Sequence, residues 1–330
     1  MNPQRSELGL KFSDRTFRFV RLSSVDTGPQ LTAAGAGLIP FDAKQGGQMR
    51  PEGADRLIDA LTRSLDRADA ERGGVVVVLD GRAVLRAVFP VSAELASTPE
   101  GLEERARWEL DRRRADIGDE EGLHVEVRLR KGPSGQPVAD AWGAYPGTLH
   151  AYDQVVQGAG CHVTGWSCDA WALYRLFEAY VPEEDRDQLT ALTHIEADTM
   201  EVILADRHGS VGLTAPRADQ TGAFRRAWDP DDPEEVAREV TWWAKQLADR
   251  WLPGSRQEQE EVSRVLFTGS VDEPDRLLGA LTRALPMRVE SLELERFMDV
   301  EPSVASSPLI QGNLGAFALS VGGALAHLSP

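Results

Sequence analysis

The stretch that decides the predicted fold is residues 8–22, with the sequence LGLKFSDRTFRFVRL. Its apolar side chains alternate with polar ones, with one slip, at Leu8, Leu10, Phe12, Phe17, Phe19 and Leu22. This spacing is close to the period of a strand that buries one face. Between the two apolar sets, Ser13 and Asp14 supply a turn. The stretch therefore predicts two short strands joined by a tight polar turn.

A similar opening returns in the second half of the sequence, at residues 195–209. Here Ile195-Glu196-Ala197-Asp198-Thr199 leads into alternating Met200, Val202 and Leu204, and Asp206 to Gly209 turn the chain. Two widely separated copies of one strand pattern indicate an internal repeat. We therefore predict two similar α/β halves that face each other.

The segments after the first opening follow the order of a ribonuclease H-like half. A third strand is expected over residues 31–39, and Leu57, Leu61 and Leu65 place one apolar face on a helix that begins near Ala54. The run Val75 to Leu79 is typical of a strand that is covered on both faces in a parallel sheet. A turn at Asp80-Gly81 then leads to a further strand over residues 84–88.

The remaining segments complete an α/β chain with one insertion. Residues 84–150 predict a small α+β subdomain, with a charged helix over 99–114 and strands over 123–130 and 139–145. In the second half, Asp232-Pro233-Glu234-Glu235 predicts a capped helix start. We expect a first domain from residues 1–83 and 151–188, closed by a helix within 313–330. The inserted subdomain covers 84–150, and a second domain covers 189–312.

Composition limits the partners that this chain can have. The formal net charge of −17 and 42 % hydrophobic content describe a folded, acidic protein. Nucleic acids and anionic membranes would repel such a surface, so we predict that the chain binds neither directly. Its two cysteines do not make a disulfide framework or a zinc site, and no signal peptide or membrane-spanning run is recognisable. A cytoplasmic location is expected.

Four short segments, in this order and spacing, resemble those of a known family. They are Leu8 to Ser13, Arg107-Trp108-Glu109 in the insert, Gly165 to Leu173, and Ala318 to Leu325. The sequence resembles the PilM-like proteins of type IV pilus assembly, which are actin-like and related to FtsA, and the resemblance covers essentially the whole chain. It implies two ribonuclease H-like domains that face a central cleft.

In that family, two Asp-x-Gly loops and a Gly-rich stretch hold a nucleotide in the cleft, because carboxylates order Mg²⁺ and glycines let backbone N–H groups approach phosphates. This sequence departs from each motif: Lys11 and Ser13 replace the first Asp and Gly, Asp198 replaces the second glycine, and one glycine of three remains at Gly269-Ser270. The resemblance implies a vestigial nucleotide cleft formed by Lys11, Ser13, Asp14, Glu196, Asp198, Thr199, Gly269 and Ser270. We expect Mg-ATP binding to be weak or absent, no hydrolysis, no catalytic residue and no metal site.

The resemblance implies a non-catalytic scaffold that binds the short cytoplasmic tail of a PilN-like inner-membrane protein between the insert and the first domain. Such a scaffold would be peripheral to the inner membrane through its partner, and self-association stays open. Two alternatives remain. One is an actin-like ATPase whose displaced metal ligands would be Glu196 and Asp198. The other is the cytoplasmic part of a GspL-like type II secretion protein.

Overall fold

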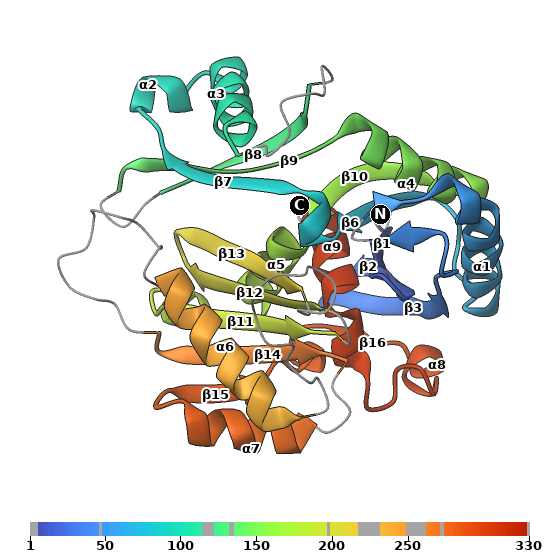
Figure 1. Ribbon diagram of the computed structural model, residues 1–330. Helices are drawn as coiled ribbons and strands as arrows, with labels where there is room; N and C mark the ends of the chain where they lie inside the picture. Colours follow the sequence, from blue (N-terminus) through green and yellow to red (C-terminus); the bar gives the residue numbers. More distant parts are fainter. Residues whose placement is uncertain are drawn as a thin grey trace.

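The chain forms two similar mixed sheets with a third, smaller sheet beside them. The computed structural model describes residues 6–45, 48–113, 122–131, 135–196, 199–216, 232–248, 262–270 and 274–328. In Figure 1, the first sheet lies at the right, the second to its left and extending lower, and the small sheet across the top. Among the described residues, no helix combines the length and the apolar character needed to cross a bilayer.

The first sheet has the strand order β10-β6-β1-β2-β3-β16. Its strands are β1 (Ser6–Phe12), β2 (Thr16–Val25), β3 (Gly28–Leu38), β6 (Gly74–Leu79), β10 (His162–Cys168) and β16 (Asp299–Val300). β1, β2 and β3 form an antiparallel meander, whereas β6 runs parallel to β1 and β10 runs parallel to β6. The predicted hairpin of residues 8–22 is confirmed as β1 and β2, because Phe12, Phe17 and Phe19 all enter one core.

The second sheet repeats this arrangement in the order β13-β12-β11-β14-β15. Its strands are β11 (Thr190–Ile195), β12 (Thr199–Asp206), β13 (Gly209–Pro216), β14 (Arg264–Gly269) and β15 (Arg288–Ser291). As in the first sheet, a three-stranded meander continues through its first strand into two parallel strands. The predicted class, two facing ribonuclease H-like halves, is thereby confirmed.

Helices cover the outer and inner faces of these sheets. They are α1 (Ala54–Arg67), α4 (Pro146–Gly158), α5 (Asp169–Tyr180), α6 (Pro233–Ala248), α7 (Pro274–Ala284), the short α8 (Pro302–Ala305) and α9 (Ala318–Leu328). α1 and α4 lie outside the first sheet, α6 and α7 lie outside the second, and α5 and α9 lie between the two sheets (Figure 1). The two-residue strands β4 (Lys44–Gln45) and β5 (Gln48–Met49) form a small hairpin before α1.

The last helix, α9, packs directly against the first strand, β1. A Cβ atom added to Gly9 of β1 would lie 2.0 Å from the carbonyl oxygen of Ser320 and 2.9 Å from the backbone nitrogen of Ala324. The absence of a side chain at Gly9 is therefore what allows backbone to approach backbone here. The helix is apolar on nearly all sides, as expected for one that is buried between sheets.

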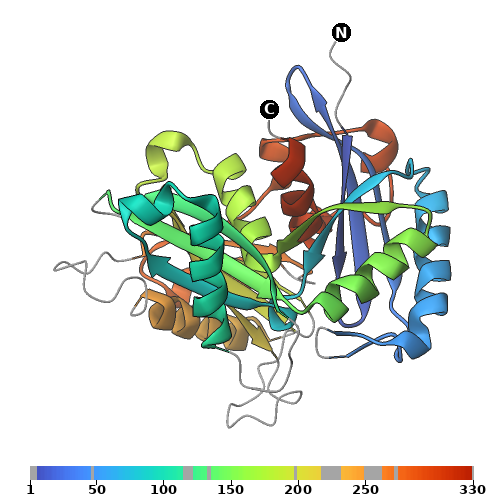
Figure 2. The ribbon, with the colours of Figure 1, turned by 90° about the horizontal axis from the view of Figure 1, so that it is seen from above.

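The insert forms its own three-stranded sheet in the order β7-β9-β8. It contains β7 (Leu85–Pro90), α2 (Ala93–Ala96), α3 (Pro99–Asp111), β8 (His124–Lys131) and β9 (Pro137–Ala144), around a separate small core. After the turn that follows β6, the chain leaves the first sheet. β7 pairs with β9 in the insert sheet. Figure 2, seen from above, shows the insert beside the first half. Where it approaches the second half, Arg130 donates to the carbonyl oxygen of His208 at 3.1 Å.

For clarity, we call the first sheet with α1, α4, α5 and α9 the first half, and the second sheet with α6 and α7 the second half. The predicted domain boundaries stay a prediction. The chain returns to the first sheet at β16, which pairs with β3, before the predicted boundary at residue 313.

The predicted capped helix start is seen in α6, since the Asp232 side chain accepts from the backbone N–H of Glu234 at 3.0 Å.

Candidate functional site: a polar network between the two halves

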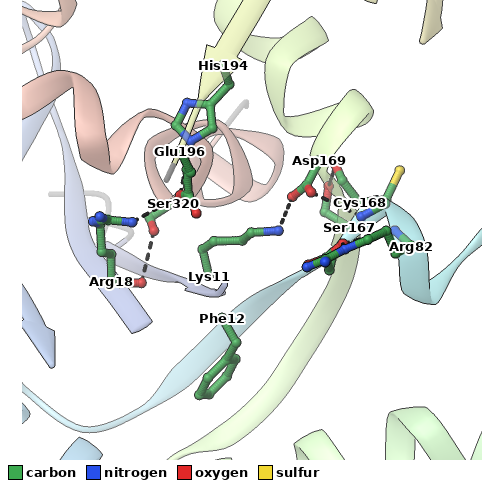
Figure 3. A network of polar contacts seen from close by, with 12 residues as sticks. Lys11, Phe12, Arg18, Arg82, Ser167, Cys168, Asp169, His194, Glu196 and Ser320 are labelled. Atoms are coloured by element: carbon green, nitrogen blue, oxygen red, sulfur yellow. Dashed lines mark hydrogen bonds and ion pairs between the residues drawn. The ribbon is translucent and has the colours of Figure 1, made fainter. Parts of the chain in front are cut away.

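Lys11 lies at the centre of a buried polar network between the halves, near the end of β1. Its ammonium group donates to a carboxylate oxygen of Asp169, the first residue of α5 (Figure 3). The other oxygen of Asp169 accepts from the backbone N–H of Gly81 at 3.0 Å. Burial alone would lower the pKa of Lys11, but Asp169 and Asp80 raise it above its usual value. Lys11 therefore carries its charge inside the protein.

A second set of contacts surrounds Asp80, which follows the buried strand β6. Its carboxylate lies 2.6 Å from a guanidinium nitrogen of Arg82 and 3.5 Å from the ammonium of Lys44. The same arginine reaches Asp14 in the turn between β1 and β2, at 2.9 Å. Lys44 also donates to the carbonyl oxygen of Phe12 at 2.6 Å. Burial would raise the pKa of Asp80, but Lys44, Arg82 and Lys11 lower it, so the carboxylate stays ionised.

The second half contributes Glu196, immediately after β11. Its carboxylate lies 3.0 Å from a guanidinium nitrogen of Arg18 on β2, and 3.2 Å from Nε2 of His194. The second terminal nitrogen of Arg18 donates to the hydroxyl of Ser270 at 2.8 Å. Burial would raise the pKa of Glu196, but His194, Arg18 and Lys11 together lower it. Arg18 is thus a direct ionic link between the two halves, as Figure 3 shows.

The other predicted site residues mainly shape the backbone around this network. Ser13 is buried in the β1–β2 turn, where its N–H donates to the carbonyl oxygen of Thr16 at 2.8 Å. Thr199 accepts from the N–H of Glu196 at 2.9 Å through its own carbonyl. Gly269 ends β14 with φ +124°, and an added Cβ atom would lie 2.0 Å from the carbonyl oxygen of Ile195. Asp198 lies outside the described residues.

The predicted residues thus form two groups. Lys11, Ser13 and Asp14 lie in the first half, and Glu196, Thr199, Gly269 and Ser270 lie in the second. The side chains that pair with them were not predicted from the sequence; they are Arg18, Lys44, Asp80, Arg82, Asp169 and His194. One signal was available: Arg18 stands between the apolar Phe17 and Phe19, so it must point to the opposite face of its strand.

The residues of this network do not fit a magnesium nucleotide. Among its described residues are four carboxylates, and each of them already faces a protein cation: Asp169 with Lys11, Asp80 with Lys44 and Arg82, Asp14 with Arg82, and Glu196 with Arg18. A phosphate chain would meet these acids and would have to displace their cations, at a large desolvation cost. Within the described ranges, no group of three His, Cys, Asp or Glu side chains is arranged to hold a metal ion.

Comparison with solved structures identifies the fold of the chain. No family model and no curated protein sequence matches the chain. Among solved structures, a chain of the PilM-PilN type IV pilus biogenesis complex is 18 % identical with a TM-score of 0.76, and the match covers 99 % of this chain and 100 % of that one.

Two further solved structures share less of the geometry. The cytoplasmic domain of EpsL, an inner-membrane component of the type II secretion system of Vibrio cholerae, is 16 % identical with a TM-score of 0.49, covering 98 % and 95 % of the two chains. A Bacteroides thetaiotaomicron protein with an actin-like ATPase fold is 10 % identical with a TM-score of 0.47, covering 89 % and 92 %. The duplicated sheets and the full-length match to a chain of the PilM-PilN complex together show that this chain has the actin-like ATPase fold.

Proposed function

We propose that this chain is a non-catalytic scaffold of a type IV pilus or related secretion assembly at the inner membrane. The observation that carries the proposal is the central polar network in an actin-like fold. An actin-like ATPase needs carboxylates that are available to order Mg²⁺ and water beside the phosphates. Here Asp80, Asp169 and Glu196 are instead paired with lysine and arginine side chains of the same chain.

The proposed partner is the cytoplasmic tail of a PilN-like inner-membrane protein. This proposal is supported by the full-length similarity to a chain of the PilM-PilN complex. A short tail of this kind would hold the acidic chain at the membrane without any contact between the chain and lipid. The location that we propose is therefore cytoplasmic and peripheral to the inner membrane.

We place the tail where the insert meets the first half. Asp140 of β9 joins the two there, since it accepts from Arg86 of β7 at 3.0 Å and from the indole N–H of Trp171 on α5 at 3.2 Å. The guanidinium of Arg128, on β8, stacks 3.7 Å from the centre of the Trp171 ring. In the described part of the insert sheet, β8 is an edge strand, so an extended peptide can add its backbone hydrogen bonds there.

The first experiment measures binding of a labelled peptide that copies the cytoplasmic tail of the PilN-like protein encoded nearest to this gene. We expect Arg128→Ala to weaken binding about tenfold, because the variant loses donors and a flat stacking surface at the junction. Lys131→Ala is the matched control, since it removes one positive charge from an exposed position on the same strand. If the partner protein is captured equally well with its tail and after deletion of the tail, the proposed partner site is wrong.

The second experiment separates a scaffold from an ATPase. Because a ligand that binds only the folded state raises the melting temperature, Mg-ATP at 100 times its dissociation constant would add about 2.7 kcal/mol of stability. We expect no rise at millimolar Mg-ATP and no phosphate release above a blank without protein. A clear rise in melting temperature, removed by Glu196→Gln, would favour the alternative of an actin-like ATP-binding protein.

A further inference from the structure

Arg18 crosses from one half of the molecule to the other. It lies on β2 between Phe17 and Phe19, both fully buried in the first core, so its side chain leaves the opposite face of the strand. Its two terminal nitrogens reach Glu196 at 3.0 Å and Ser270 at 2.8 Å. These two acceptors follow β11 and β14 respectively. Because Ile195 and Gly269 are partners in the register of these strands, one guanidinium group holds two adjacent strand ends.

Both ends of this contact are fixed by their own surroundings. On the first half, the carbonyl oxygen of Arg18 accepts from the hydroxyl of Ser320 on α9 at 2.9 Å. On the second half, His194 contacts Glu196, and the backbone N–H of Ser270 donates to the carbonyl oxygen of Ile195 at 2.9 Å. A planar guanidinium that binds two preset acceptors loses little additional freedom, so the contact is favourable and specific in direction.

The contact is also shielded from water. The side chain of Arg18 is 13 % exposed and that of Glu196 is 5 % exposed. At this depth, an ion pair is screened little by salt, and loss of one partner leaves a charge buried without compensation. A neighbouring contact also joins the halves: the hydroxyl of Thr268 on β14 donates to the carbonyl oxygen of Gly315, just before α9, at 3.1 Å.

We propose that Arg18 is an interdomain latch that holds the two halves of this actin-like fold at one fixed angle without a nucleotide. The latch lies where the resemblance predicts phosphates between the halves, and protein side chains make the connection there. The scaffold would then keep one shape whatever the cellular ATP concentration. This inference concerns the free chain and does not depend on the partner that we propose above.

The test measures the distance between the halves directly. Spin labels are attached at Arg63→Cys on α1 and Ala284→Cys on α7, both exposed helix positions in opposite halves. The native Cys161 and Cys168 are buried, and burial raises the pKa of the Cys168 thiol to about 12, so neither competes for the label. Pulsed electron spin resonance then gives the distribution of distances between the labels, with and without Mg-ATP.

We expect one narrow distance distribution for the parent chain, unchanged by Mg-ATP. Arg18→Ala should broaden it or add a second maximum, and should lower the melting temperature by roughly 3–7 °C. Arg15→Ala is the matched control, because it removes an exposed arginine from the neighbouring turn and should leave both readings unchanged. A distribution for Arg18→Ala identical to that of the parent chain would overturn the latch.

Two milder variants keep the test decisive if Arg18→Ala does not fold. Arg18→Lys retains the charge but can no longer reach both acceptors in one plane, and Ser270→Ala removes one acceptor only. Each should broaden the distribution less than loss of the whole side chain. If both variants fold and both give the parent distribution, the halves are held by other contacts and the proposal is wrong. Failure of the tail peptide to bind would leave these distances unaffected.

Discussion

The two ends of the central polar network are built differently. At the first-half end, the charges compensate one another locally, since Lys11, Asp80 and Asp169 all belong to the first half. At the second-half end, the cation for Glu196 comes from Arg18, across the boundary between the halves. The first end therefore contributes to the stability of one half, whereas the second end decides how the halves are joined. Variants at the first end should therefore lower the stability of one half, whereas variants at the second end should change how the halves are joined.

The largest effect is expected at the first-half end. Lys11→Ala leaves the carboxylate of Asp169 buried without its cation, which should cost about 3–5 kcal/mol of unfolding free energy. Urea denaturation measures this loss. Lys131→Ala, at an exposed position, should change the free energy by less than about 0.5 kcal/mol. Equal losses in the two lysine variants would contradict the local compensation described above.

A double substitution sharpens the same point. Lys11→Met combined with Asp169→Leu replaces the ion pair by apolar groups, and such replacements of buried pairs are often neutral or stabilising. We expect the double variant to recover at least part of the stability lost in Lys11→Ala. A double variant less stable than Lys11→Ala would mean that Asp169 contributes mainly through its contact with the N–H of Gly81.

An intermediate effect is expected for Glu196 in acid. Its pKa lies below the ordinary value of 4.5, so its ionisation stabilises the folded state above that pH. This contribution is lost as the pH falls through the folded-state pKa, at about 1.4 kcal/mol per pH unit. As the pH falls below 4.5, the unfolding free energy of the parent chain should therefore approach that of Glu196→Gln.

The control for this pH series is Glu295→Gln, at an exposed position between β15 and β16. Its difference from the parent chain should be small at every pH, because an exposed carboxylate gains little on folding. A difference between the parent chain and Glu196→Gln that stays constant from neutral to acidic pH would show that Glu196 is not held as a carboxylate by its cationic neighbours.

The smallest effect is expected for Ser270→Ala. This variant removes one neutral acceptor from Arg18 and leaves Glu196 in place, so the unfolding free energy should fall by about 1 kcal/mol. Ser24→Ala, at an exposed position on β2, should be neutral. Urea denaturation of the two variants compares them directly. A loss for Ser270→Ala as large as that for Lys11→Ala would remove the distinction between the two ends.

Local patterns in the sequence predict most elements of the fold. The alternation in residues 8–22 predicts β1 and β2, the β-branched run at Val75 predicts β6, and the Asp232-Pro233 cap predicts the start of α6. These features are local, because each depends on residues within one or two turns or strands. The pairing partner of β7, by contrast, does not follow from local sequence. The strand itself is predicted, but nothing in its own residues says that it pairs with β9 in a separate sheet.

The candidate site shows the same limit more strongly. Sequence reasoning finds Lys11 as a departure from an acidic motif, yet its partner Asp169 lies 158 residues away. Likewise, Glu196 is predicted as a retained acid, whereas its partner Arg18 is 178 residues distant. Ion pairs of this separation follow from the packing of the two halves. Only the tertiary structure can show that these carboxylates are already neutralised.

The packing of α9 against Gly9 has a consequence for folding during synthesis on the ribosome. The first half needs α9 to cover β1, but the ribosome synthesises all of the second half before it reaches residue 318. The second half is continuous in sequence and can form its core as it emerges. The strands β1, β2 and β3 must therefore wait, with their apolar surface uncovered, for a helix that is made only after the second half. Chaperones should consequently bind the nascent chain through these three strands.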